Sequence, residues 1–197
     1  MTTESLTAAE ILTFWFGDDG AVRNDLWFGG GPAFDALIRE RFGEHVRRAA
    51  AGDYQHWMGT ARESLALIIL LDQFTRNVHR GRAASWWLDP LAQRIAADTV
   101  DSEQDKQLPL LQRVFCYLPF EHSEDRDLQA RSVACYEQLL EDSPDGFKEN
   151  AQAYLLYAQR HRAVVERFGR FPHRNPILGR ESTAEELAFV AEHGTGF

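Results

Sequence analysis

The segment from Thr60 to Phe74 constrains the fold most, because seven consecutive apolar residues, Leu65 to Leu71, lie inside it. A helix that is apolar on nearly all sides is stable in water only when other elements cover most of its surface. A chain of 197 residues is long enough to supply that cover from one core, without disulfides or structural metals. The segment therefore predicts a central helix that is surrounded by the other elements of a single domain.

The rest of the chain spaces its apolar residues as helices do and shows no strand-like alternation. We expect about eight helices, over residues 7–16, 32–51, 60–74, 89–100, 108–118, 123–140, 147–168 and 182–192. The sequence thus predicts an all-α fold, a single domain over residues 1–197 whose helices pair into antiparallel hairpins.

Capping and helix-breaking residues give the boundaries of these segments. Thr7 is followed three residues later by Glu10, as in a capping box, and Asp89-Pro90 is a typical N-cap and first-turn pair. Gly169 suits the end of the longest helix, and two overlapping capping boxes, from Ser182 and Thr183, precede the last one. Two connections, residues 17–31 and 169–180, are longer than simple connectors and are candidate functional loops.

The helix over residues 108–118 meets a proline at its end. Pro119 is expected to stop that helix, and Ser123 is expected to be the N-cap of the next one, with Glu124 in its first turn. Glu121 and His122 would then lie in a tight corner between two helices.

Composition and charge exclude several classes of protein. The formal charge is −9, and a general nucleic-acid binder would need a net basic face. Residues 1–10 carry no Lys or Arg and no apolar run, and the longest apolar run is far shorter than a membrane span of about 20 residues. Cys116 and Cys135 are expected to be reduced thiols. We therefore expect a cytoplasmic protein with no nucleic-acid and no membrane partner.

Charge is distributed unevenly along the chain. Residues 98–149 hold thirteen acids and five bases, whereas residues 160–180 hold six arginines and one acid. One interpretation is that the arginines pair with the acidic segment inside the fold, and this is expected for most of them. The other is that several of them form an anion site. Lysine catalysis is not expected, since only two of the 21 basic residues are lysines.

A first polar cluster follows the apolar helix. Asp72 continues its buried stripe, and Arg76 lies four residues later, where it can pair with that carboxylate. An internal ion pair is the expected role of Asp72. For Arg76, Asn77 and Arg80, an internal role and a role in binding an anion are both open.

The second and third clusters contain histidines. His122 lies beside Glu121 and Glu124, where an imidazole could act as an acid or a base. His161 falls on the apolar face of the helix over residues 147–168, where a satisfied core role is expected. His173 lies in a segment that alternates cations with aromatic residues and prolines, Arg170 to Arg174. That segment suits either a small anion or a rigid loop whose arginines tie helix ends together.

Signatures of common cofactors are absent from the sequence. The chain has no phosphate-binding P-loop, no Rossmann glycine pattern, no His-Glu-x-x-His and no nucleophile elbow. No cofactor is expected. A weaker hypothesis is a mononuclear metal site, whose candidate ligands are Asp72, His122, Glu124, His161 and His173.

Four stretches of the sequence resemble one bacterial family, called domain of unknown function 924. They are residues 11–17 (ILTFWFG), 71–77 (LDQFTRN), 117–124 (YLPFEHSE) and 167–175 (RFGRFPHRN), in the same order along nearly the whole chain. The family usually has Pro in place of Thr75 and Met or a similar residue in place of Glu121, which leaves His122 and Glu124 as better catalytic candidates. The resemblance implies an all-α fold similar to tetratricopeptide-type helical arrays, and it implies no established activity.

Two hypotheses about function follow. The first is a site for a small anion, a carboxylate or a phosphate, in a binding protein or an enzyme. Its substrate-binding residues would be Asp72, Arg76, Asn77, Arg170 and Arg174, and its catalytic residues His122, Glu124 and His173. The alternative is a tetratricopeptide-like helical scaffold that binds a peptide or a protein partner.

Overall fold

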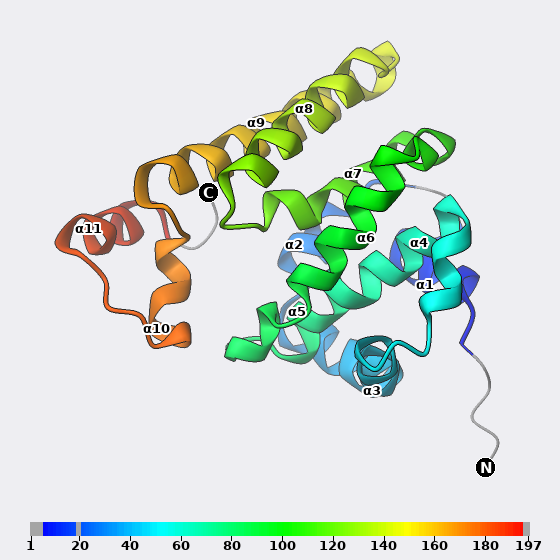
Figure 1. The fold of residues 1–197 in the computed structure, drawn as a ribbon, viewed down its shortest axis with the longest axis horizontal. Coiled ribbons are helices and arrows are strands. Elements are labelled where there is room, and N and C mark those ends of the chain that lie inside the picture. The colour runs from blue at the N-terminus through cyan, green and yellow to red at the C-terminus, as the bar shows by residue number, and fades with distance from the viewer. Residues whose placement is uncertain (1–5, 19–20, 195–197) are drawn as a thin grey trace. The chain divides into compact units, whose positions relative to one another are not determined.

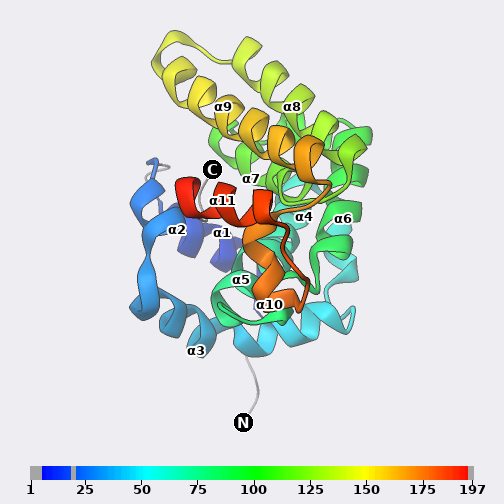
Figure 2. The same ribbon diagram turned by 90° about the vertical axis from the view of Figure 1, so that its left-hand side faces the viewer.

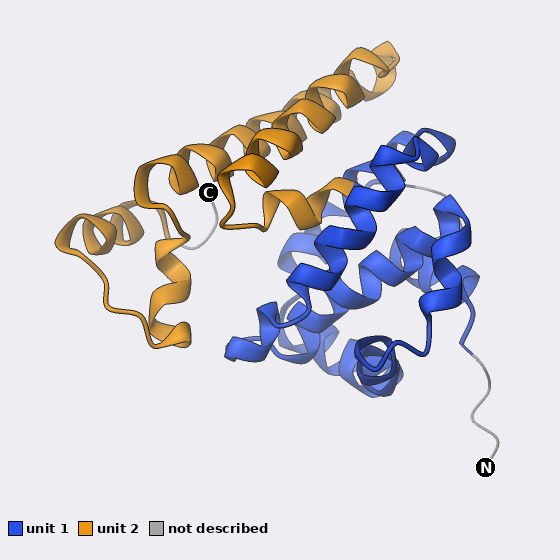
Figure 3. Cartoon of the chain, in the orientation of Figure 1, with its two compact units in different colours: residues 1–116 blue, residues 117–197 orange. Residues whose placement is uncertain are grey.

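A computed structural model describes residues 6–18 and 21–194 (Figure 1). All regular structure in these residues is helical, so the prediction of an all-α fold is confirmed. The chain divides into two compact units, residues 1–116 (unit 1) and 117–197 (unit 2), shown in Figure 3. The prediction of one domain over residues 1–197 stays a prediction.

The longer helices of the described residues correspond in order to the eight predicted segments. They are α1 (Ala8–Phe16), α3 (Gly31–Ala50), α4 (Ala61–Ile68), α6 (Asp89–Asp101), α7 (Leu110–Glu121), α8 (Arg126–Glu141), α9 (Asp145–Phe168) and α11 (Ala184–His193). The shorter α-helical segments are α2 (Asn24–Gly29), α5 (Thr75–Val78) and α10 (Asn175–Leu178). Four 3₁₀ turns, η1 (Gln55–Gly59), η3 (Ala83–Trp86), η4 (Gln104–Gln107) and η5 (Pro172–Arg174), and a π-helical segment, η2 (Ile69–Phe74), complete the order.

The predicted central helix of unit 1 is confirmed. α4 packs against α1 and α6, and its continuation η2 packs against α3 and α6. All seven apolar residues from Leu65 to Leu71 are at most 3% exposed. The helix does not end at Phe74, as the sequence predicted, but continues through η2 and α5 to Val78.

The π-helical segment has a local cause and a local consequence. The hydroxyl of Thr75 donates to the carbonyl of Leu70, five residues earlier, at 3.1 Å. This bond supports the wider turn, in which a carbonyl is paired five residues along instead of four. The turn places Asp72 and Gln73 in the interior, where the amide of Gln73 donates to the carboxylate of Asp72 at 2.5 Å.

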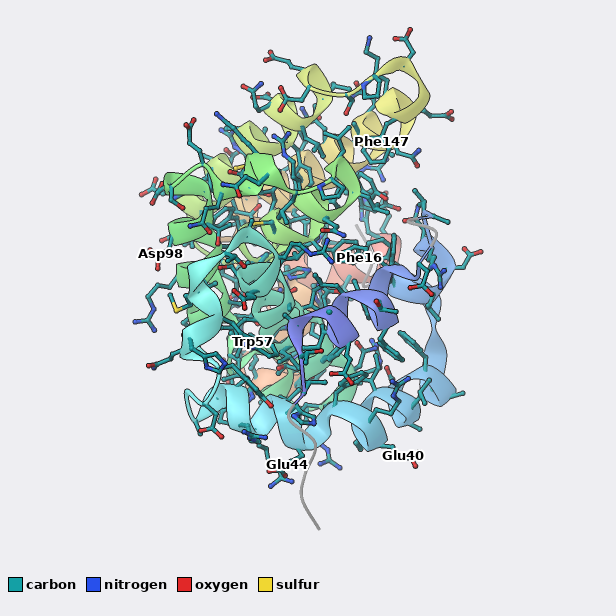
Figure 4. All side chains as sticks on the ribbon, turned by 90° about the vertical axis from the view of Figure 1, so that its right-hand side faces the viewer. Phe16, Glu40, Glu44, Trp57, Asp98 and Phe147 are labelled. Atoms are coloured by element: carbon teal, nitrogen blue, oxygen red, sulfur yellow. The ribbon has the colours of Figure 1, made fainter. Side chains whose placement is uncertain are left out.

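Aromatic side chains fill the rest of the unit 1 core. Trp15 contacts Trp27, Phe34, Phe74 and Phe115, with ring centroids 5.5 to 6.4 Å apart. The face of α3 that points away from these rings is polar, and Glu40 and Glu44 point outward from it (Figure 4). This is the division of faces that an amphipathic helix requires.

In unit 2, α8 and α9 form an antiparallel hairpin and lie side by side along their length (Figure 1, Figure 2). Three residues, 142–144, join them. α11 packs on η5, and its Phe189 contacts a small core of Val164, Val165 and Phe171.

Two predicted boundaries near the start of unit 2 are wrong. α7 passes Pro119 and ends at Glu121. A proline near the end of a helix removes only one backbone donor. The backbone that follows still forms helical hydrogen bonds, as the N–H of His122 does with the carbonyl of Leu118 at 2.9 Å. The N-cap of α8 is Asp125, whose carboxylate accepts from two backbone N–H groups. Ser123 instead accepts from the N–H of Asp125.

Other predicted helix starts and connections also differ in detail from the structure. Asp89 is the first residue of α6, after its N-cap Leu88. Of the two capping boxes before α11, Thr183 forms one with Glu186, whereas Ser182 accepts a hydrogen bond from Asn175. The two long connections contain short helices, α2 in one and η5 with α10 in the other; residues 19–20 of the first lie outside the described residues.

Two further findings concern the cysteines and the membrane. Neither Cys116 nor Cys135 forms a disulfide, in agreement with the prediction of reduced thiols. Within the described residues, none of the helices combines the length and the apolar character that crossing a bilayer demands.

The two ends of α9 give a matched pair of glycine substitutions. Gly169 has φ +70° and open space where a Cβ would stand, so Gly169→Ala incurs only backbone strain. We expect it to lower the free energy of unfolding by about 1 kcal/mol. Gly146, in the first turn of the same helix, also has open space but no left-handed φ. Gly146→Ala should leave stability equal or raise it by up to about 1 kcal/mol, as urea denaturation would show. Equal losses in the two variants would contradict this account.

Candidate functional site

The first polar cluster, in unit 1, is an internal ion network. The guanidinium of Arg76 contacts the carboxylate of Asp72 at 3.0 Å, as the four-residue spacing predicted. It also meets both carboxylate oxygens of Asp89, at 2.9 and 3.0 Å. Burial alone would lower the pKa of Arg76, but the two carboxylates outweigh burial and raise it. An incoming anion would have to displace Asp89 from this bidentate contact.

Asn77 and Arg80 belong to a second network of unit 1. Both donate to the buried carboxylate of Asp35, Asn77 at 2.8 Å and Arg80 at 2.5 and 2.9 Å. Burial raises the pKa of Asp35, but these donors lower it below its usual value. Asp35 is thereby stabilised as a carboxylate, and it ties α3 to the segment that follows α5.

Unit 2 holds the other predicted residues, organised around Phe171. Glu124 accepts a hydrogen bond from the backbone N–H of Phe171 at 2.8 Å and forms a bidentate pair with Arg180 at 2.7 and 2.9 Å. Arg180 also donates to the carbonyl of Phe171 at 3.2 Å. Glu124 and Arg180 therefore hold both the backbone N–H and the backbone carbonyl of Phe171.

Three cationic or titratable side chains surround the buried ring of Phe171. The guanidinium of Arg174 lies over it at 4.4 Å from the ring centroid, and the rings of His161 and His173 have centroids 5.6 and 5.8 Å away. We call Glu124, His161, Phe171, His173, Arg174 and Arg180 the Phe171 cluster.

Both histidines of this cluster are neutral at neutral pH. Burial lowers the pKa of His161 to about 4, and the nearby Arg174 acts in the same direction. Burial, followed by Arg174, likewise lowers the pKa of His173 to about 4. Burial tends to raise the pKa of Glu124, but Arg180 and the N–H of Phe171 lower it below its usual value. Glu124 is thus a fixed carboxylate and not a proton donor.

His161 has a defined tautomer, which sequence reasoning missed. Its Nδ1 lies 2.9 Å from the carbonyl of Tyr157, which can only accept, so Nδ1 carries the proton and Nε2 the lone pair. The buried carboxylate of Glu121 lies 3.5 Å from the same Nδ1. Helical spacing placed His161 on an inner face but gave no signal for this contact, because Glu121 lies forty residues away along the chain.

His122 joins the cluster through its backbone. Its carbonyl accepts from the guanidinium of Arg174 at 3.0 Å. Its imidazole is close enough to affect the pKa of both His161 and His173. The structure therefore brings together four predicted site residues in unit 2, which are His122, Glu124, His173 and Arg174.

Arg170 lies outside this group. It forms a bidentate pair with Glu186 at 2.6 and 2.9 Å and donates to the carbonyl of Glu181. The contact with Arg170 lowers the pKa of Glu186 to about 2. The expectation that most arginines of residues 160–180 pair with acids of residues 98–149 is wrong for three of them: Arg162 pairs with Glu166, Arg167 with Glu185 and Arg170 with Glu186, and the first two pairs are exposed. Arg180 does pair with Glu124 of that segment.

The remaining predictions concern a metal site, a pocket and a single site built from both units. In the described part of the chain, no three His, Cys, Asp or Glu side chains are arranged to hold a metal ion. A pocket of unit 1, lined by Met58 and Asp98 among others, contains none of the predicted site residues. Asp72, Arg76 and Asn77 belong to unit 1 and the other candidates to unit 2, so one site built from both sets stays a prediction.

Comparisons with known proteins agree on one group. The family model described as "Bacterial protein of unknown function (DUF924)" matches residues 11–194. A solved structure of a protein of unknown function from Agrobacterium tumefaciens, ATU0120, is similar, with 40% sequence identity and a TM-score of 0.80. The match covers 94% of this chain and 97% of that one. No match was found among curated proteins.

Because His161 and His173 are neutral in the folded protein, we predict that acid lowers its stability. Their folded pKa of about 4 lies below the usual 6.5, so between these values the unfolded chain binds more protons than the folded one. We expect the free energy of unfolding to fall as pH drops from 6.5 to 4, by up to about 1.4 kcal/mol per pH unit for each histidine. Urea denaturation across this range measures it. His161→Asn should flatten the slope, whereas His193→Asn, an exposed site, should not. A wild-type curve that is flat from pH 6.5 to 5 would refute this expectation.

The network of Arg76 gives a second prediction. Arg76→Met would remove a guanidinium that contacts the buried carboxylates of Asp72 and Asp89, so the free energy of unfolding should fall by about 3 kcal/mol or more. Arg47→Met, which removes an exposed pair with Glu44, is the matched control and should change it by less than about 0.5 kcal/mol. Similar small losses in both variants would mean that the Arg76 network contributes little.

Proposed function

We propose that the chain, which belongs to the bacterial DUF924 family of proteins of unknown function, binds a small anion at the Phe171 cluster of unit 2. The ligand class is a carboxylate or a phosphate. Arg174 would bind it, and His122 or His173 would exchange a proton with it.

The observation that carries this proposal is the position of Arg174 among neutral imidazoles. Arg174 is only 7% exposed and lies over Phe171, next to His161 and His173, which are uncharged at neutral pH. A cation in a poorly hydrated setting attracts an anion more strongly than it would in water. A guanidinium also suits the two-oxygen geometry of a carboxylate or a phosphate.

Proton exchange is the chemistry that this setting supports. A bound anion would favour the protonated imidazole and raise the pKa of His173 from about 4 toward the neutral range. The imidazole would then become a competent acid or base. Arg76 and Arg170 are not included as ligands, because each guanidinium already forms a bidentate pair with a carboxylate.

The second candidate function is the tetratricopeptide-like scaffold that binds a peptide or a protein. The observation that favours it is a set of exposed apolar side chains in unit 2: Leu156 and Tyr157 on α9 and Leu187 on α11, which are 43%, 48% and 61% exposed. Such residues scattered singly are common, so this candidate comes second. A cytoplasmic location stays a prediction from the sequence.

Thermal-shift measurements with inorganic phosphate and with malonate test the proposal. At 100 times its Kd, a ligand should stabilise the wild type by about 2.7 kcal/mol. Arg174→Met should abolish the ligand-induced shift, whatever its own effect on stability. Arg162→Met removes an exposed arginine of α9 and should keep the shift. An equal shift in Arg174→Met and the wild type would contradict the proposed site, and no shift with either anion would contradict the ligand class.

A further inference from the structure

The C-terminal end of α7 leaves carbonyl groups that need donors. The last turn of a helix has no partners within the helix for its carbonyls, and burying them unpaired is costly. Here the end is buried, since Phe120, Glu121 and Ser123 are at most 5% exposed. The carbonyl of Phe120 accepts from the backbone N–H of Ser123 at 3.1 Å, and further donors come from other elements of unit 2.

One side chain supplies most of them. Gln129 is 0% exposed, and its amide nitrogen lies 2.7 Å from the carbonyl of Glu121, 2.6 Å from that of Ser123 and 3.5 Å from that of Phe120. The carbonyl between them, that of His122, accepts from Arg174 at 3.0 Å. Side chains of α8 and η5 thus contact each carbonyl from residue 120 to residue 123.

This arrangement fixes the backbone on both sides of His122. The peptide groups of Glu121 and Ser123 are held by the amide of Gln129, and that of His122 is held by Arg174. Since a side chain leaves the backbone in a direction set by φ and ψ, holding these groups limits where the imidazole of His122 can lie. We infer that Gln129 is the positioning residue for His122, and the relevance of that role for anion binding rests on the proposed function.

The orientation of the Gln129 amide follows from its acceptors. Carbonyl oxygens only accept, so the NH₂ group must face them and Oε1 must face away. Oε1 is buried and has no hydrogen-bond partner among the described residues, and the same holds for the hydroxyl of Ser132, one turn further along α8. The two residues therefore form a matched pair, since both are buried polar groups of α8, but Gln129 donates hydrogen bonds to the end of α7 and the hydroxyl of Ser132 makes none in the described part of the chain.

The test reads His122 directly, without a ligand. ¹⁵N-edited NMR spectra of the imidazole would give the tautomer and titration midpoint of His122 in the wild type, Gln129→Met and Ser132→Ala. We expect Gln129→Met to move the midpoint by about 0.5 pH unit or more, because the imidazole leaves its place among the charges of the cluster. Ser132→Ala should leave both signals unchanged.

A wild-type measurement covers the case in which Gln129→Met does not fold. The side-chain NH₂ protons of Gln129 should exchange with D₂O much more slowly than those of Gln152, which is exposed on α9. Exchange as fast as that of Gln152 would overturn the inference. So would a folded Gln129→Met with unchanged His122 signals, even if it were less stable, because Gln129 would then only support the fold.

The failure of this inference and that of the proposed function are distinguishable. If the wild type binds neither phosphate nor malonate, the proposed function fails while the His122 signals still report on Gln129. If the wild type binds phosphate, Gln129→Met should weaken the affinity about tenfold, as the loss of a supporting hydrogen bond typically does. An unchanged affinity together with unchanged His122 signals would overturn the positioning role alone.

Discussion

The carboxylate of Glu124 holds the candidate site of unit 2 together. A half-buried carboxylate must be paired, and this one binds the N–H of Phe171 and both terminal nitrogens of Arg180. It thereby ties the segment after α9 to the corner before α8. The ring of Phe171, fixed in this way, is the surface on which Arg174 and the two histidines gather. The role of Glu124 is therefore architectural and electrostatic, and a role in proton transfer would require that its contacts with Phe171 and Arg180 break.

The helices could be predicted from the sequence because their signals are local. Apolar spacing and capping residues gave the eight longer helices, and the box at Thr7 and the cap at Gly169 formed as expected. Two boundaries could not be predicted, because the residue types alone do not decide between the alternatives. Ser123 and Asp125 are equally good caps by residue type, and Pro119 fits inside the last turn of α7 because only one donor is lost. The π-helical turn at Asp72 left no recognisable signal in the sequence.

The site could be predicted in part for the same reason. The pair of Arg76 with Asp72 follows from a spacing of four residues, but its bidentate partner, Asp89, comes from another helix. The sequence left two interpretations of the arginine-rich stretch of residues 160–180, internal pairing for most of the arginines and an anion site for several, and in the structure Arg170 pairs with Glu186. Gln129 was missed entirely, because a glutamine within a helix has no distinctive pattern until its amide is seen against the end of α7.

The central claim is that an anion binds among histidines that are neutral until it arrives. Calorimetric titration of inorganic phosphate at pH 5.5, in two buffers of different ionisation enthalpy, tests it most directly. The account predicts binding heats that differ between the buffers, because the bound anion raises the pKa of His173 from about 4 and protons are then taken up at the cluster. Equal net proton uptake in the wild type and in His122→Asn/His173→Asn would contradict the account, as would the absence of binding.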